Sequence, residues 1–130
     1  MVAAGTNAAT DGRTMDLNAA HAAHSAWKGR FRQAIENKET LDAVRIGRDD
    51  CCELGTWLHG EGRVRLGHLP EFVSLLEKHK EFHREAGFVA DMINQKQYSN
   101  AVAQIGGMTY FATTSDATGA AILALKKASS

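Results

Sequence analysis

The segment KHKEFHRE, residues 78–85, holds two histidines four positions apart, His79 and His83. On a helix this spacing places both imidazoles on one side, one turn apart. Apolar residues recur around them at steps of three and four, and both histidines fall on that apolar stripe. Two inward-facing imidazoles without partners would cost roughly 1–3 kcal/mol for each unsatisfied group. The pattern therefore predicts a partner in the core, and a metal ion is the first candidate.

Two further residues are candidates to complete such a site. His24 lies on the apolar stripe of an expected first helix, and Cys52 lies in a shorter second helical segment. Three imidazoles and one thiolate suit tetrahedral zinc, whereas calcium and magnesium prefer oxygen ligands. Copper and nickel accept the same ligand types, so residue types alone leave them open. A diiron site would need inward-facing carboxylates, and Glu81 and Glu85 are poorly placed for that role.

Neighbouring residues offer alternatives to this ligand set. His21 shares a helix face with His24 and is the main rival for the first ligand. Cys51 directly precedes Cys52, and we expect it to pack as a small apolar residue. Its alternatives are to replace Cys52 as a ligand or to react with the oxidised form of Cys52. For His79 and His83, the alternative to metal binding is an ordinary pair of core histidines that are hydrogen-bonded to backbone groups or carboxylates.

The elements that must position these residues are expected to be helical. Proline occurs once, good helix formers are abundant, and few segments alternate as strands do. We expect an all-α antiparallel four-helix bundle with a shorter second helix. One domain is expected at residues 15–128, after a flexible tail at residues 1–14. Apolar stripes predict four helices, over residues 16–38, 49–60, 70–93 and 99–127.

Capping residues mark the ends of these segments. Asp16 is expected to cap the first helix, Asp49 and Asp50 lie at the start of the second, and Ser99 is expected to cap the last. Pro70 suits the first turn of the third helix, where its missing N–H would be unpaired anyway. Three glycines predict a kink or a close helix approach in the last helix: Gly106, Gly107 and Gly119.

Composition narrows the function classes. The formal net charge is +0, so no basic surface for nucleic acid is indicated. The N-terminus lacks the apolar region of a secretory signal, and no segment is apolar enough to insert into a membrane. A disulfide between the two adjacent cysteines would be strained, so the cysteines indicate a reducing cytoplasm.

Three runs also resemble a known family motif. In order they are HSAW at residues 24–27, CELGTW at 52–57 and HKEFH at 79–83. They resemble the HxxW, CxLGxW and HxxxH blocks of the bacterial chemoreceptor zinc-binding domain, and the resemblance extends over residues 16–127. It implies zinc bound by His24, Cys52, His79 and His83. We expect four residues to pack around the site: Trp27, Gly55, Trp57 and Phe82.

The resemblance implies a sensory role and a partner. Domains of this family are attached to chemoreceptors and diguanylate cyclases, often dimerise, and respond to zinc and to oxidants such as hypochlorous acid. The redox-sensitive residue here would be Cys52, whose oxidation would remove the sulfur ligand. We therefore expect a cytoplasmic homodimer. Its output domain is expected in cis within a longer protein or in trans, because the 130 residues include none.

Two other functions use the same ligands. A zinc hydrolase would need an open coordination position and a nearby carboxylate base, and the pattern provides neither, so we expect no enzyme. A structural bundle in which zinc only staples a dimer fits the sequence as well as a sensor does. Measurements of zinc exchange and of the response to oxidants would distinguish the structural bundle from the sensor.

Overall fold

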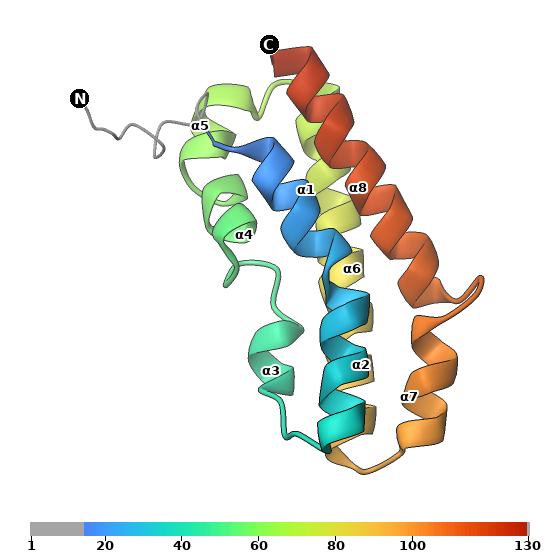
Figure 1. The fold of residues 1–130 in the computed structure, drawn as a ribbon. Helices are drawn as coiled ribbons and strands as arrows, with labels where there is room; N and C mark the ends of the chain where they lie inside the picture. The colour runs from blue at the N-terminus through green and yellow to red at the C-terminus, as the bar shows by residue number, and fades with distance from the viewer. Residues whose placement is uncertain (1–14, 130) are drawn as a thin grey trace.

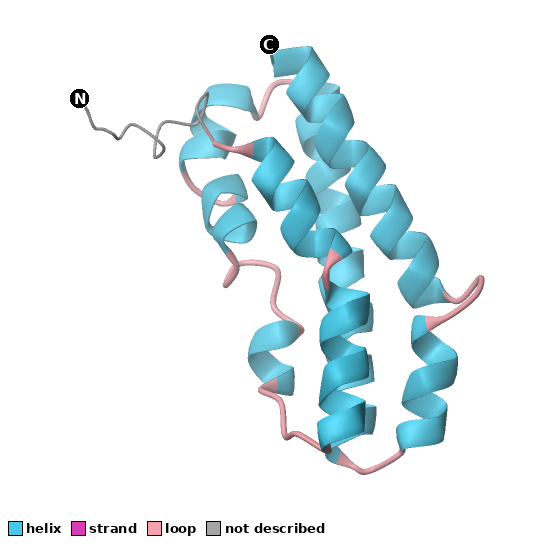
Figure 2. Cartoon of the chain, viewed as in Figure 1, coloured by secondary structure: helices cyan, strands magenta, loops and turns pink. Residues whose placement is uncertain are grey.

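The computed structural model describes residues 15–129, and within them every regular element is a helix (Figure 1 and Figure 2). The helices are α1 (Leu17–Ser25), α2 (Trp27–Asn37), α3 (Ala43–Ile46), α4 (Glu53–Leu58), α5 (Glu61–Leu66), α6 (Pro70–Asn94), α7 (Tyr98–Ile105) and α8 (Tyr110–Ser129). The predicted all-α fold is confirmed. The tail predicted at residues 1–14 lies outside the described residues.

The helices form a bundle around α6, as Figure 1 shows. This helix runs along the molecule and packs against α8, α3 and α7. The successive helices α1 and α2 run in the same direction as α6, whereas α7 and α8 run against it. On the remaining side, the three short helices α3, α4 and α5 take the place of the single shorter helix that was predicted.

Two of the predicted helices are interrupted. The last one is divided between α7 and α8, where Gly106 is extended and Gly107 has a φ of 62°. A glycine adopts this left-handed conformation without steric cost, so the predicted kink becomes a complete break. The first one is divided at Ala26, whose backbone stays close to helical with φ −79° and ψ −11°. The chain therefore continues from α1 into α2 with little change of direction.

Two predicted helix starts are confirmed and one is wrong. The Asp16 carboxylate accepts a hydrogen bond of 2.9 Å from an N–H in the first turn of α1. Pro70 is the first residue of α6, where its missing N–H costs nothing. Ser99 does not cap α7, because it already lies inside that helix. The capping position belongs to Gln97, which makes no side-chain hydrogen bond there.

The caps predicted at Asp49 and Asp50 are also wrong. The helix begins after them, and Cys52 occupies the N-cap of α4, where its sulfur accepts an N–H of the first turn. The sulfur thus takes the place of a capping carboxylate. Asp49 instead lies with a carboxylate oxygen 3.0 Å from a ring nitrogen of His59, and Asp50 is paired with Arg48 at 3.0 Å.

The hydrophobic core is divided into two clusters along the bundle. The upper cluster contains Leu17, Ala20, Leu54, Trp57, Leu58, Leu66, Phe72, Leu75, Ala121, Ile122 and Leu125. The lower cluster contains Phe31, Ala34, Phe82, Ala86, Val89, Ala90, Ile93, Ala101, Ile105 and Phe111. On α6, His79 falls between Leu75 of the upper cluster and Phe82 of the lower one. A buried polar layer therefore separates the two clusters.

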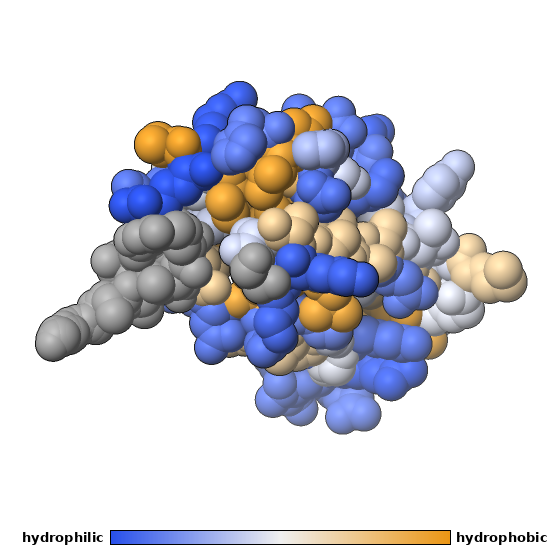
Figure 3. All heavy atoms as spheres, turned by 90° about the horizontal axis from the view of Figure 1, so that it is seen from above, coloured by the Kyte–Doolittle hydropathy of each residue, from blue (hydrophilic) through white to orange (hydrophobic). Residues whose placement is uncertain are grey.

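The surface at one end of the molecule is mainly hydrophilic. Figure 3, seen from the end where α5 and the C-terminus lie, shows blue side chains over most of the coloured surface, with smaller orange areas between them. Among the described residues, no helix combines the length and the apolar character needed to cross a membrane.

Candidate metal centre

The first two candidate ligands come from consecutive turns of α6. His79 and His83 have 0 % and 2 % of their surface exposed, so the prediction that both face the core is confirmed. They lie on the apolar stripe of a 25-residue helix, and their rings are 4.4 Å apart between centroids. The i, i+4 spacing thus brings two imidazoles to the same point of the core.

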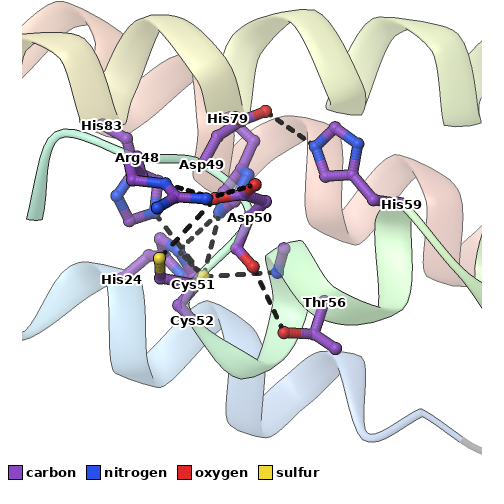
Figure 4. Close-up of polar contacts among 11 residues, drawn as sticks. His24, Arg48, Asp49, Asp50, Cys51, Cys52, Thr56, His59, His79 and His83 are labelled. Atoms are coloured by element: carbon purple, nitrogen blue, oxygen red, sulfur yellow. Dashed lines mark hydrogen bonds and ion pairs between the residues drawn. The ribbon is translucent and has the colours of Figure 1, made fainter. Parts of the chain in front are cut away.

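The third candidate, His24, comes from the last turn of α1. Its side chain is 5 % exposed, and its Nδ1–H donates a hydrogen bond of 2.8 Å to the carbonyl oxygen of Ala20. This bond fixes the ring and leaves the Nε2 lone pair free for the interior of the bundle. Figure 4 shows the ring directed towards the histidines of α6.

The fourth candidate, Cys52, stands at the start of α4. Its Sγ accepts the backbone N–H of Gly55 at 3.2 Å. A side chain at position 55 would collide with the carbonyl oxygen of Asp49, so the loop before Cys52 can lie close to α4 only because this residue is glycine. The glycine of the CxLGxW run therefore allows the loop to bring the sulfur to the histidines.

The four ligand atoms converge, each within 4.8 Å of the others. The Sγ atom of Cys52 lies 3.3 Å from Nε2 of His79, 3.6 Å from Nε2 of His83 and 3.9 Å from Nε2 of His24. The Nε2 atoms of His24 and His79 are 3.1 Å apart. A tetrahedral zinc ion with usual bond lengths would require separations of about 3.6 Å between sulfur and nitrogen and about 3.3 Å between nitrogens. The arrangement therefore fits zinc in size as well as in ligand type.

The electrostatic environment keeps the three histidines neutral, which is their metal-binding form. Burial lowers the pKa of His79 to about 2, and burial likewise lowers the pKa of His24 and of His83. Burial also raises the pKa of the Cys52 thiol, and the N–H of Gly55 partly opposes that rise. A bound cation would favour the thiolate, since coordination deprotonates a thiol.

The outer nitrogens of the three rings have different surroundings. His83 donates its Nδ1–H to the carbonyl oxygen of Ile46 at 2.8 Å, just as His24 does to Ala20. Nδ1 of His79 is buried and has no hydrogen-bond partner among residues 15–129. Two of the three rings are thus oriented by backbone carbonyls, which a sequence motif does not reveal.

The four residues expected to pack around the site lie in different places. Gly55 donates to the sulfur, and the Phe82 ring lies 5.5 Å from that of His24 and 5.4 Å from that of His83. Trp27 packs on Phe31 beside the lower hydrophobic cluster. Trp57 packs on Phe72 in the upper cluster. Trp57 is thus buried in the upper cluster and Trp27 is partly buried beside the lower one, so the two tryptophans lie on opposite sides of the polar layer.

The rival ligands are not part of the converging group. His21 faces Gly119 of α8, where an added Cβ would lie 3.1 Å from its ring nitrogen. The Cys51 sulfur is 3.6 Å from a carboxylate oxygen of Asp50 (Figure 4). The contact of Asp49 with His59 flanks the site, and the sequence does not mark it, because no periodic pattern links a loop residue to a helix end.

A comparison with known families supports the metal assignment. The sequence profile described as the chemoreceptor zinc-binding domain matches residues 24–90, just over half of the chain. No curated protein and no solved structure gave a match. The metal of this family is zinc, and the matched range contains all four converging residues. The cofactor of the domain is therefore Zn²⁺.

Proposed function

Because the chain belongs to the chemoreceptor zinc-binding domain family, we propose that it is a zinc-dependent sensory domain. In this proposal His24, Cys52, His79 and His83 hold the ion. The observation that supports it most is the convergence of four buried or half-buried ligand atoms from α1, α4 and α6 within 4.8 Å. Four protein ligands complete a tetrahedron and leave no position for a reactive water, so the proposal includes no catalytic activity.

The position of the site supports a sensory role. The ligands lie between the upper and lower hydrophobic clusters, where helices from three parts of the chain meet. A bound ion would tie these helices together through all four side chains at once. Occupancy of the site is thereby coupled to the packing of the bundle.

Cys52 is the residue through which an oxidant would act. Its thiolate would donate an electron pair to hypochlorous acid, giving a sulfenic acid and chloride, with the proton and oxygen of the acid retained on sulfur. The sulfur lone pair is then less available to a metal, and the contact between α4 and the three histidines weakens. A reducing cytoplasm supports this chemistry, because the thiol must be regenerated between events.

The proposed partners are a second copy of the chain and a chemoreceptor or diguanylate cyclase output domain, in cis or in trans. The family description supports the receptor connection. Large apolar side chains on the surface are available for association, including Val44 at 79 %, Met108 at 98 % and Tyr110 at 79 % exposure. Sedimentation of the zinc-loaded chain over a range of concentrations tests the dimer.

The main experiment combines zinc content with helix packing. Zinc stoichiometry, affinity, circular dichroism and sedimentation are measured for the wild type, for Cys52→Ser and for the matched control Cys51→Ser, each before and after chelator or hypochlorous acid. We expect the control to behave as the wild type, and Cys52→Ser to lose most of the zinc affinity and the oxidant response. Equal zinc affinity in both variants would remove Cys52 from the ligand set. Zinc that neither exchanges nor responds to oxidant would favour a structural staple.

A further inference from the structure

We infer that Gly87 is a positioning residue for the metal centre, acting through a backbone contact with Gly47. The inference rests on the proposed zinc ligands and adds a residue outside all three motif runs. Gly87 lies on α6, one turn after His83, and therefore on the same face of the helix. That face carries α3 and the loop that follows it.

The contact between the two glycines is a contact between main chains. A Cβ built on Gly87 would lie 2.8 Å from Cα of Gly47 and 3.3 Å from its nitrogen. Two carbon atoms normally approach to about 3.5–4.0 Å, so a side chain at position 87 would push Gly47 outwards by roughly 0.7–1.2 Å. The neighbour cannot rotate away as a flexible side chain would, because it is backbone.

This displacement reaches the metal centre through one peptide unit. The carbonyl of Ile46 is bonded to the nitrogen of Gly47, and a peptide group is planar and stiff. The oxygen of that carbonyl accepts the Nδ1–H of His83 at 2.8 Å. Moving Gly47 away from α6 by the distance above would stretch this hydrogen bond to about 3.5–4.0 Å, at or beyond the limit for such a bond. The Nε2 atom of His83 would then lose its fixed direction towards Cys52.

The segment that contains α3 runs from Leu41 to Gly47, and its Leu41 end is held against α6 independently of the glycine contact. The side chain of Asn94 bonds both backbone groups of Leu41, accepting the N–H at 2.8 Å and donating to the carbonyl at 2.8 Å. No residue of α3 is fully buried, and its partly buried Ala43 and Ile46 pack against the lower hydrophobic cluster. The Gly47–Gly87 contact lies at the second end of the segment, where its backbone meets that of α6.

Three glycine variants of the full chain test the inference. Gly87→Ala is expected to weaken zinc binding by about 10-fold or more, the usual effect of losing a hydrogen-bond partner of a ligand. Gly47→Ala is expected to have a smaller effect, because its Cβ would lie 3.3 Å from the Ala43 carbonyl oxygen and 3.6 Å from Cα of Gly87. Gly29→Ala is the control, since nothing lies within 4 Å of its added Cβ.

A second readout separates positioning from general destabilisation. In the zinc-loaded protein, the NMR signal of the His83 Nδ1–H reports the bond to Ile46, and the visible spectrum of the cobalt-substituted protein reports ligand geometry. We expect both to change in Gly87→Ala and to stay unchanged in Gly29→Ala. The inference would be overturned if Gly87→Ala bound zinc with an affinity within twofold of that of Gly29→Ala and its Nδ1–H signal were unchanged.

The outcomes remain distinct if the Gly87→Ala variant does not fold. In that case Gly47→Ala decides by the same two readouts, against the same control. Failure of the wild type to bind zinc would instead refute the proposed ligands, because that result does not involve the glycines.

Discussion

Removal of zinc is predicted to move one proton within His79 while the neighbouring rings keep theirs. If the proposed ligands hold zinc, all three Nε2 lone pairs would serve the metal and each ring would carry its proton on Nδ1. For His24 and His83 that proton is shared with a backbone carbonyl oxygen at 2.8 Å. Nδ1 of His79 has no such acceptor in the described part of the chain. His79 is therefore the ring that is free to change tautomer.

The distances give the size of this preference. Without zinc, a proton on Nε2 of His79 would be donated to Nε2 of His24 at 3.1 Å, and the Cys52 thiol would be donated to Nε2 of His83 at 3.6 Å. Each hydrogen bond contributes about 0.5–1.5 kcal/mol, whereas each unsatisfied buried group costs about 1–3 kcal/mol. The new tautomer should thus be favoured by about 1–3 kcal/mol, or from about fivefold to over a hundredfold. The same bonds should keep the zinc-free bundle folded.

Nitrogen-15 NMR of the histidine rings, recorded with and without chelator at a pH above 7, measures the tautomers directly. We expect His79 to change from Nδ1–H to Nε2–H on chelation, while His24 and His83 remain Nδ1–H. Circular dichroism of the same samples should show that helix content is kept. A His79 ring that stays protonated on Nδ1 after zinc is removed would refute the reasoning, and so would loss of the helical signal.

Three further predictions concern packing, geometry and pH. Phe82→Ala should lower the free energy of unfolding by about 3–5 kcal/mol in urea titrations, because Phe82 is 0 % exposed. Phe88 is half-exposed, so Phe88→Ala should lower it by less than about 1 kcal/mol. Similar losses in the two variants would contradict the different burial of the two rings. Gly55→Ala should weaken zinc binding by about 10-fold or more in a competition titration, since its Cβ would displace the loop before Cys52, and an unchanged affinity would contradict that clash. The zinc-free protein should lose stability as the pH falls below about 6.5, because the unfolded chain takes up a proton that folded His79, with its pKa lowered to about 2, does not. The loss should approach about 1.4 kcal/mol per pH unit for this residue, and a denaturation midpoint independent of pH between 7 and 5 would contradict it.

The sequence determined the class of fold and the identity of the converging residues. Steps of three and four along α6 placed His79 and His83 on the apolar stripe, and burial of 0 % and 2 % agrees with this. Such periodicity is a local property, since a helix face follows from chain geometry alone. Periodicity placed His21 and His24 on one face, and the tryptophan three residues after His24 favoured His24; the spacing of the three motif runs is matched by the family profile.

Only the tertiary structure decided where the helices break, what caps them and what surrounds the ligands. The capping sulfur of Cys52 and the pairing of Asp49 with His59 depend on a loop whose path no periodic pattern specifies. The carbonyl acceptors are backbone atoms that every residue carries, so the sequence does not mark them. The approach of Gly47 to Gly87 joins positions 40 residues apart through atoms that have no side chain at all. Such contacts arise from the packing of whole elements, because the distance between two backbones is set by everything that lies between the helices.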